Sequence, residues 1–362
     1  MKLLRLKITN PAGFRSLPYG FEHHFRSEWS LQDERAKLDG FAPFVCAGPN
    51  GSGKSNLLEV LAAIFFQLEV QRVRRSFLPD AFSKDEKDNK KEIDSIPNAY
   101  ELEYLIKLPF DALPESERYA RVRVNKEPQV SPQMYWLNPK NFAAFSESLA
   151  DDGLCSERER DFLLPEYVLG YSSGENEILS LPFFKMRFVQ FDEYWNSLKE
   201  QLPYPGRPET RLAYLDNGFS QAILLCNLLF QDEATLQPFR EDVGVEKLIE
   251  FRIIIRHSIA VATDVANTFG SNHPALTTDS ETGEHRVNLM QLLEAGPNSA
   301  TNFDPIVTRL KRCATCWFID EAIDTLVLDY WVNEATKLAF RENFMTTFIN
   351  HHWRCSRPFK SC

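Results

Sequence analysis

The residues best suited to chemistry lie in one short run, Gly48-Pro49-Asn50-Gly51-Ser52-Gly53-Lys54-Ser55. The run matches G-x-x-x-x-G-K-[ST], the pattern of a phosphate-binding loop. Its glycines let the backbone turn sharply and bring amide groups close to phosphate oxygens. Lys54 would reach the β- and γ-phosphates of a nucleotide, and the Ser55 hydroxyl would bind Mg²⁺. The run therefore predicts a site for a nucleoside triphosphate and magnesium.

Such a loop works only between a strand and a helix, and the flanking sequence predicts both. Residues 41–47 (FAPFVCA) form a short apolar run that is typical of a buried strand. Large apolar residues then recur at helical spacing from Asn56 to Leu68. The N-terminus of that helix would add partial positive charge where the phosphates lie. Nucleotide binding needs only these parts, whereas hydrolysis needs further residues.

Two other patterns predict the sheet around this loop. Leu4, Leu6 and Ile8 alternate with charged residues, which indicates a first strand with one buried face. Residues 100–108 and 119–124 also alternate, and the short segment between them favours an antiparallel pair. Antiparallel strands directly after the first helix favour an ABC-like lobe over a purely parallel P-loop fold.

The apolar patterns beyond this point predict a mixture of elements with several helices. They indicate helices over 219–230 and 245–266, a loop with a small hairpin over 270–305, and a strand or a buried helix over 315–332.

Composition restricts the class of protein. The net charge is −10, from 41 basic and 51 acidic residues, so any contact with nucleic acid must be local. No apolar run is long enough for a membrane span, and seven cysteines without an export signal indicate reduced thiols in the cytoplasm. Cys313 and Cys316 form a C-x-x-C pair, but the nearest further ligands (His351, His352, Cys355 and Cys362) match no zinc-finger spacing, so we expect ordinary thiols.

The chain from Met1 to Leu68 resembles the ABC/SMC-like ATPases, in which an early strand, a GPNGSGKSN loop and a helix open the lobe. Asn50 and Asn56 beside the glycines fit that group better than GTPases. Three later segments resemble the ATPase subunit of Septu- and retron-type anti-phage defence systems, within the P-loop AAA ATPases. They are residues 168–177 (VLGYSSGENE), 329–336 (DYWVNEAT) and 340–344 (FRENF).

This resemblance implies an ATP- and Mg²⁺-dependent subunit, a homodimer or larger assembly, that controls an HNH nuclease. In retron systems it also implies a reverse transcriptase and its RNA–DNA product as partners, and no membrane. The expected fold is an α/β, ABC/SMC-like P-loop ATPase lobe with a large, mostly helical insertion or arm. We assign 1–130 to the N-terminal part of the lobe, 131–344 to the mainly helical arm and 345–362 to an irregular tail.

Hydrolysis in such ATPases needs a signature sequence and a Walker B strand, an apolar run that ends in Asp-Glu. Three places imitate the strand. Residues 186–193 end in Asp192-Glu193 but are interrupted by Arg187 and Gln190; residues 316–321 end in Asp320-Glu321; residues 325–329 lack the Glu. Family members carry both elements beyond the segment at 340–344, so we expect the genuine Walker B strand to be absent and the chain to be C-terminally incomplete.

Three functions compete. The first is an ATP-binding regulatory subunit that hydrolyses ATP if the Walker B and signature elements are supplied, and whose nucleotide-driven dimer controls a nuclease. The chain itself has no HNH core and no Ser/His/Asp triad. The second is a DNA-repair or SMC-like ATPase that grips DNA itself through Arg72, Arg74 and Arg75. The third is a scaffold that binds ATP without hydrolysing it.

Overall fold

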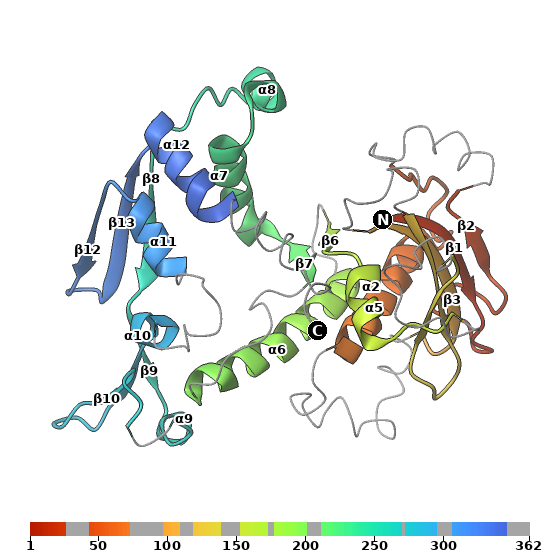
Figure 1. Cartoon of the computed structure of the whole chain (residues 1–362), viewed down its shortest axis with the longest axis horizontal. Helices are drawn as coiled ribbons and strands as arrows, with labels where there is room; N and C mark the ends of the chain where they lie inside the picture. Colours follow the sequence, from red (N-terminus) through yellow and green to blue (C-terminus); the bar gives the residue numbers. More distant parts are fainter. Residues whose placement is uncertain are drawn as a thin grey trace, which may run out of the picture. The chain divides into compact units, whose positions relative to one another are not determined.

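The structure is a computed structural model that describes residues 1–26, 43–72, 97–108, 119–138, 153–172, 177–200, 211–269, 272–294 and 306–345. The chain divides into two compact units (Figure 1). The first unit comprises Met1–Gln190 and Glu209–Leu215, and the second comprises Phe191–Pro208 and Asp216–Cys362. The first unit extends past the boundary expected at 130, because Met134, Trp136 and Leu163 belong to the same core as the N-terminal strands.

The first unit is built on a five-stranded antiparallel sheet with the order β2-β1-β3-β4-β5; its strands β1, β2 and β3 are labelled in Figure 1. Its strands are β1 (Lys2–Ile8), β2 (Glu22–His24), β3 (Tyr100–Lys107), β4 (Tyr119–Lys126) and β5 (Gln133–Trp136). The predicted antiparallel pair is confirmed, because β3 and β4 pair along their whole lengths. β1 lies between β2 and β3.

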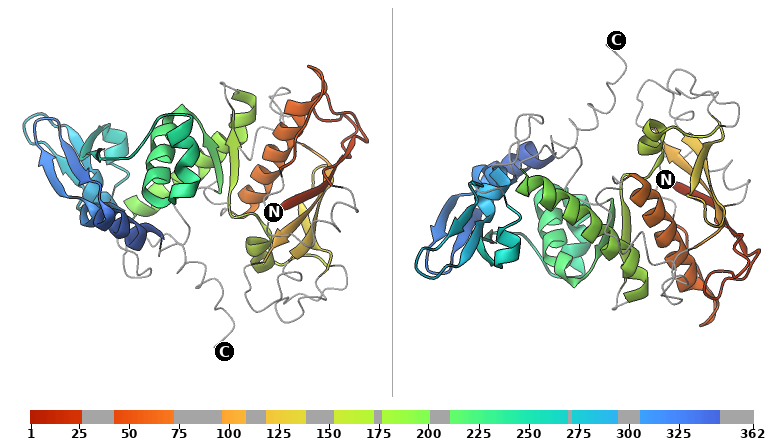
Figure 2. Two further views of the ribbon diagram at one scale, coloured as in Figure 1. Left: turned by 90° about the horizontal axis from the view of Figure 1, so that it is seen from above. Right: turned by 90° about the horizontal axis from the view of Figure 1, so that it is seen from below.

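One face of this sheet is buried against a long helix, α2 (Lys54–Arg72), which lies beside the sheet in both views of Figure 2. Burial alternates along β1 as its sequence does, with Leu4, Leu6 and Ile8 inside. Leu57 and Ile64 of the helix belong to the same core cluster. The first strand and the helix after the loop are therefore confirmed, and the helix places the phosphate loop beside the sheet.

A short helix also packs on this core. α5 (Glu157–Leu163) begins with a capping box, in which Ser156 and Glu159 satisfy each other's backbone N–H groups. The hydroxyl of Tyr104 on β3 donates to the carbonyl oxygen of Leu163 at 2.9 Å. Because Tyr104 is fully buried, this bond fixes α5 to the sheet.

The first unit also holds the only parallel pair of strands in the part of the chain that the structure describes. β6 (Val168–Tyr171) pairs in parallel with β7 (Leu212–Leu215), and α6 (Glu177–Lys199) lies between them in sequence. Phe183 and Met186 of α6 pack against Phe66 of α2 in a small core cluster.

The second unit contains two three-stranded antiparallel sheets, with the orders β12-β13-β8 and β10-β11-β9. Their strands are β8 (Glu250–Arg256), β9 (Ser258–Val261), β10 (Leu276–Thr278), β11 (His285–Asn288), β12 (Cys316–Asp320) and β13 (Thr325–Trp331). Tyr330 of β13 stacks on Phe251 of β8 with ring centroids 4.4 Å apart, at the centre of this unit's larger core.

The second unit also contains six complete α-helices and two helical turns among the described residues. They are α7 (Ser220–Phe230), α8 (Glu233–Glu241), α9 (Thr263–Ala266), α10 (Leu289–Glu294), α11 (Ile306–Cys313) and α12 (Glu334–Phe340), with a 3₁₀ turn η4 (Asn217–Phe219) and a π-helical turn η5 (Arg341–Met345). α7 confirms the helix expected over 219–230. Among the described helices, none has the length and apolar character that a bilayer crossing needs.

Two predictions for the segment 131–344 are wrong. The helix expected over 245–266 consists of strands β8 and β9 followed by the single turn α9. Consecutive β-branched residues at 253–255 favour a strand, and β13 provides its partner. The segment is therefore a mixture of helices and small sheets instead of a mainly helical arm.

The hairpin expected within 270–305 is confirmed as β10–β11. In the tail, residues 346–362 lie outside the described residues.

Candidate nucleotide-binding site

The phosphate loop adopts a conformation that only glycine accepts easily. Gly51 and Gly53 have φ angles of +82° and +87°, in the left-handed region that disfavours residues with a Cβ atom. The amide of Ser52 donates to the carbonyl of Pro49 at 3.3 Å, which closes the turn. The loop then leads directly into α2, whose first residue is Lys54. The predicted order of loop and helix is therefore present.

Lys54 folds back over the loop that precedes it. Its ammonium group donates to the carbonyl oxygens of Gly48 at 2.7 Å and Pro49 at 2.8 Å, and to the Ser52 hydroxyl at 3.4 Å. The cation is thus held within the curve of the loop and is still reachable from solvent. A phosphate at this point would accept hydrogen bonds from the ammonium group, and these would be stronger than the present bonds to neutral carbonyl oxygens because both partners would be charged.

The helix N-terminus supplies the other donors. The first backbone N–H groups of any α-helix have no partner within the helix and carry partial positive charge. Ser55 is exposed in this first turn, which contains no acidic residue that would repel a phosphate. The donor set of amides, ammonium and hydroxyl therefore fits a triphosphate with Mg²⁺.

The turn after β1 that contains Arg15, Ser16 and Leu17 contacts the phosphate loop. The sequence analysis did not predict this contact. The side-chain Nδ2 of Asn56 donates to the Ser16 hydroxyl at 2.6 Å. A Cβ atom on Gly53 would lie 3.2 Å from Cδ2 of Leu17 and 3.4 Å from Oγ of Ser16. These contacts join residues about forty positions apart, so no local periodicity could indicate them.

The same turn is tied to α2 by an ion pair. Arg15, which has a φ of +51°, places Nη2 2.9 Å and Nε 3.0 Å from Oε1 of Glu59. Glu59 is a buried carboxylate on α2. Burial raises its pKa above the usual value, and the hydrogen bond and charge of Arg15 oppose that shift only in part. The pair therefore holds the turn against the helix that carries the phosphate loop.

The strand predicted before the loop is wrong for its described part. Residues 43–47 pair with no strand in the described chain, and Val45 is 80% exposed; residues 41 and 42 lie outside the described residues. Phe44 instead packs edge-on against His23 and Phe25, with centroid distances of 5.4 and 5.1 Å. A strand needs a neighbour to satisfy its backbone, and residues 43–47 add to neither edge of the described five-stranded sheet.

The candidates for Walker B are not buried parallel strands. Residues 186–193 lie within helix α6, so the strand ending at Asp192-Glu193 is wrong. Asp320 ends β12, an exposed edge strand that pairs only with β13 and is antiparallel to it, and Glu321 begins the following turn. Asp329 accepts two hydrogen bonds from Arg252. The structure thus places Asp320 and Glu321 in the second unit and Lys54 in the first.

The remaining predicted groups are the candidate zinc ligands and the arginines of the DNA-gripping alternative. Cys313 is buried and Cys316 is exposed, and no group of metal-binding side chains occurs among the described residues. The other four candidate zinc ligands lie outside those residues. For the DNA-gripping alternative, Arg72 is the last residue of α2, whereas Arg74 and Arg75 lie outside the described residues.

The segments that carry the family resemblance lie in both units. Residues 168–171 form β6, and 329–336 and 340–344 run from the end of β13 through α12 into η5. No protein-family model matches the chain, and no curated protein and no solved structure matches it either. The resemblance to defence ATPases therefore stays a prediction, and function must be argued from the site.

Proposed function

We propose that this chain binds ATP and Mg²⁺ through residues 48–55 and acts as the regulatory subunit of an anti-phage defence complex. The observation that carries nucleotide binding is the Lys54 ammonium group, held inside the curve of a glycine loop that opens a long helix. The defence setting rests on the resemblance of three segments, which also proposes a cytoplasmic assembly of at least two copies with an HNH nuclease. Reverse transcriptase and an RNA–DNA hybrid are the further partners proposed for a retron setting.

The site residues have distinct roles in this proposal. Backbone amides of the loop and of the first turn of α2 surround the phosphates. Lys54 exchanges two carbonyl oxygens for oxygens of the β- and γ-phosphates, and Ser55 provides an oxygen ligand for Mg²⁺. Ser16 orients Asn56 beside the loop. Because this turn also packs on Gly53, nucleotide binding and the position of β1 are coupled.

The second candidate function is an ATP-binding scaffold without turnover. It is favoured by the carboxylates, because Asp192-Glu193 lies in a helix and Asp320-Glu321 lies at the end of an edge strand. Hydrolysis on this chain alone would need a carboxylate that polarises water beside the γ-phosphate. We therefore propose binding as the chain's own activity and turnover as a property of the assembly.

The experiment compares the oligomeric state of the purified chain by analytical ultracentrifugation, with and without ATP and Mg²⁺. We expect ATP to shift the wild type to a dimer or larger species and to leave Lys54→Ala unchanged. Lys247→Ala, which removes an exposed lysine of the second unit, is the matched control and should behave as the wild type. If the chain binds ATP but its oligomeric state does not change, alone or with its nuclease, the result contradicts the nucleotide-driven dimer and favours the scaffold.

A further inference from the structure

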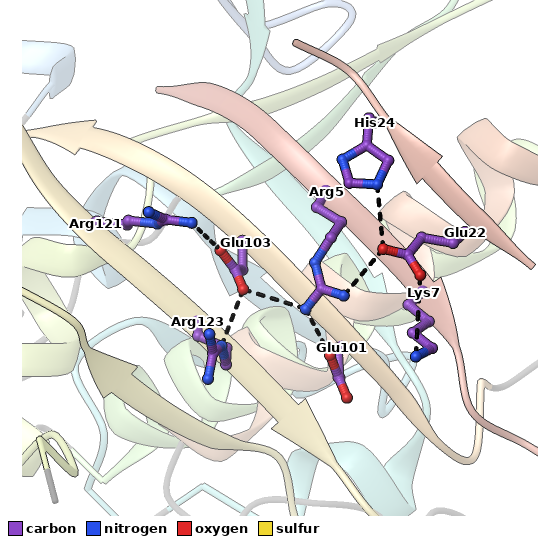
Figure 3. Close-up of polar contacts among 8 residues, drawn as sticks. All are labelled: Arg5, Lys7, Glu22, His24, Glu101, Glu103, Arg121 and Arg123. Atoms are coloured by element: carbon purple, nitrogen blue, oxygen red, sulfur yellow. Dashed lines mark hydrogen bonds and ion pairs between the residues drawn. The ribbon is translucent and has the colours of Figure 1, made fainter. Parts of the chain in front are cut away.

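The face of the five-stranded sheet opposite its core carries a cluster of charged side chains centred on Glu103 (Figure 3). The Glu103 side chain is only 4% exposed, and it accepts hydrogen bonds from three arginines. Arg121 Nη2 lies 2.8 Å from Oε2, while Arg123 Nε and Arg5 Nη2 lie 3.0 and 3.2 Å from Oε1. One carboxylate on β3 thus orients guanidinium groups from the strands on either side.

Positive charge exceeds negative charge at the β4 side of this cluster. Arg5 has further carboxylate partners, Glu101 at 2.6 Å and Glu22 at 3.2 Å, so its charge is neutralised. Arg121 and Arg123 have only Glu103 as a carboxylate partner among the described residues, and they share it. A locally positive surface therefore stands on a chain whose net charge is −10.

Arg121 and Arg123 also keep donors free for a ligand. Their side chains are 52% and 43% exposed. Arg123 donates to Glu103 through Nε, so its two terminal nitrogens donate to no group among the described residues, and Arg121 uses one terminal nitrogen. The two residues are two positions apart on one strand, so they point to the same face and their Cα atoms lie about 7 Å apart.

Burial and hydrogen bonding fix the protonation state of Glu103. Burial alone would raise the pKa of Glu103, but the hydrogen bonds and charges of Arg121 and Arg123 outweigh it and hold this pKa below the usual value. Glu103 is therefore ionised at neutral pH and keeps the two guanidinium groups in place. Preorganised groups lose less entropy when a ligand binds.

An aromatic ring lies next to this pair of arginines. Tyr135 on β5 is the direct pairing partner of Arg123, so its ring stands on the same face of the sheet. Its hydroxyl donates to the Gln133 side chain at 2.8 Å, and the ring is partly exposed. Arginines beside a partly exposed aromatic ring are a combination that can bind phosphates and stack bases in single-stranded nucleic acids.

We propose that Arg121, Arg123 and Tyr135 form a binding surface for single-stranded nucleic acid, with Glu103 as the positioning residue. The two guanidinium groups contact phosphates, and the Tyr135 ring stacks on a base. An acidic protein segment would satisfy the arginines but would make no use of the ring. This surface is independent of the phosphate loop, so Lys54→Ala should leave it unchanged.

Fluorescence anisotropy with the full chain tests the proposal. The probes are labelled oligo(dT), labelled oligo(U) and a labelled DNA duplex, each titrated at about 50 and about 200 mM salt. The test variant is Arg121→Gln with Arg123→Gln and Glu103→Gln, because the third change avoids a buried carboxylate that has lost two partners. The matched control is Arg187→Gln with Arg240→Gln, two exposed arginines outside this sheet.

Losing two phosphate contacts on a single strand should remove roughly 1.4 units from the salt slope, and weaken binding about tenfold at the lower salt concentration. Tyr135→Leu should weaken binding to oligo(dT) or oligo(U) at both salt concentrations and leave the slope unchanged. Comparison of these two probes identifies DNA or RNA as the ligand. Circular dichroism confirms that each variant is folded.

Three results would overturn the proposal. They are no binding of either single strand by the folded wild type, an equal loss in the control variant, and tighter binding to the duplex than to both single strands. Binding to polyglutamate but to no nucleic acid, with the same dependence on Arg121 and Arg123, would assign the surface to an acidic protein instead.

Discussion

Replacement of Gly53 by alanine tests the two reasons for which the structure needs glycine at this position. The φ angle of +87° would cost a residue with a Cβ atom about 1 to 2 kcal/mol. The new Cβ atom would also lie 3.2 Å from Leu17 Cδ2, and Leu17 is only 3% exposed. A forced shift of that buried side chain costs about 1 kcal/mol more. We therefore expect Gly53→Ala to lower the free energy of unfolding of the first unit by about 2 to 3 kcal/mol.

Two other glycines separate these effects. Gly20 has a φ of +79° and Gly51 has a φ of +82°, and a Cβ atom on either would meet nothing within 4 Å. Both alanine variants should lose only the backbone contribution, about 1 to 2 kcal/mol. Gly51 belongs to the phosphate loop and Gly20 does not. ATP affinity should therefore fall by about tenfold or more in Gly51→Ala and Gly53→Ala, and stay unchanged in Gly20→Ala.

Urea unfolding followed by circular dichroism measures the stabilities, with separate transitions fitted if the two units unfold separately. Titration calorimetry of the folded variants measures the ATP affinities. The reasoning is refuted if Gly53→Ala is as stable as Gly20→Ala, because the contact with Leu17 would then carry no cost. It is also refuted if Gly51→Ala and Gly53→Ala both bind ATP as tightly as the wild type.

Three further predictions concern contacts within the first unit. Arg15→Ala should destabilise the first unit by about 3 kcal/mol, since it leaves a buried carboxylate unpaired, and Glu59→Gln in the same chain should restore most of this loss in urea unfolding. The raised pKa of Glu59 means that the folded state holds this proton more tightly than the unfolded chain does. Its contribution therefore favours folding below pH 4.5 and is lost as the pH rises through the raised pKa, and Glu59→Gln should remove this part of the pH dependence. Tyr104→Phe should cost about 1 kcal/mol through loss of the bond to Leu163, and an unchanged unfolding midpoint would show that this bond does not fix α5.

Local patterns predicted those parts of the fold that depend on one face being buried. The alternation of Leu4, Leu6 and Ile8 gave a strand, and the helical spacing after Lys54 gave a helix, because each pattern matches a single period. The phosphate loop could be predicted because Gly51 and Gly53 adopt positive φ angles that other residues disfavour.

Non-local pairing explains the errors. Phe251 and Ile255 fit helical spacing, but Phe251, Ile253 and Ile255 also fit the alternating spacing of a strand. Pairing with β13 makes this segment a strand. The apolar run before the phosphate loop has a strand composition but lacks a pairing partner in the described chain. The contacts of Ser16 with Asn56 and of Arg15 with Glu59 join distant positions, so they emerge only from the folded chain.

Titration of the full-length chain with ATP and Mg²⁺ in a calorimeter tests the central claim most directly. Because Lys54 and the loop amides belong to a single loop, we predict saturable binding at one site per chain. Binding should disappear in Lys54→Ala and persist in Lys247→Ala. If well-folded wild-type protein takes up neither ATP nor any other nucleoside triphosphate, the loop is not a nucleotide site and the proposed function is wrong.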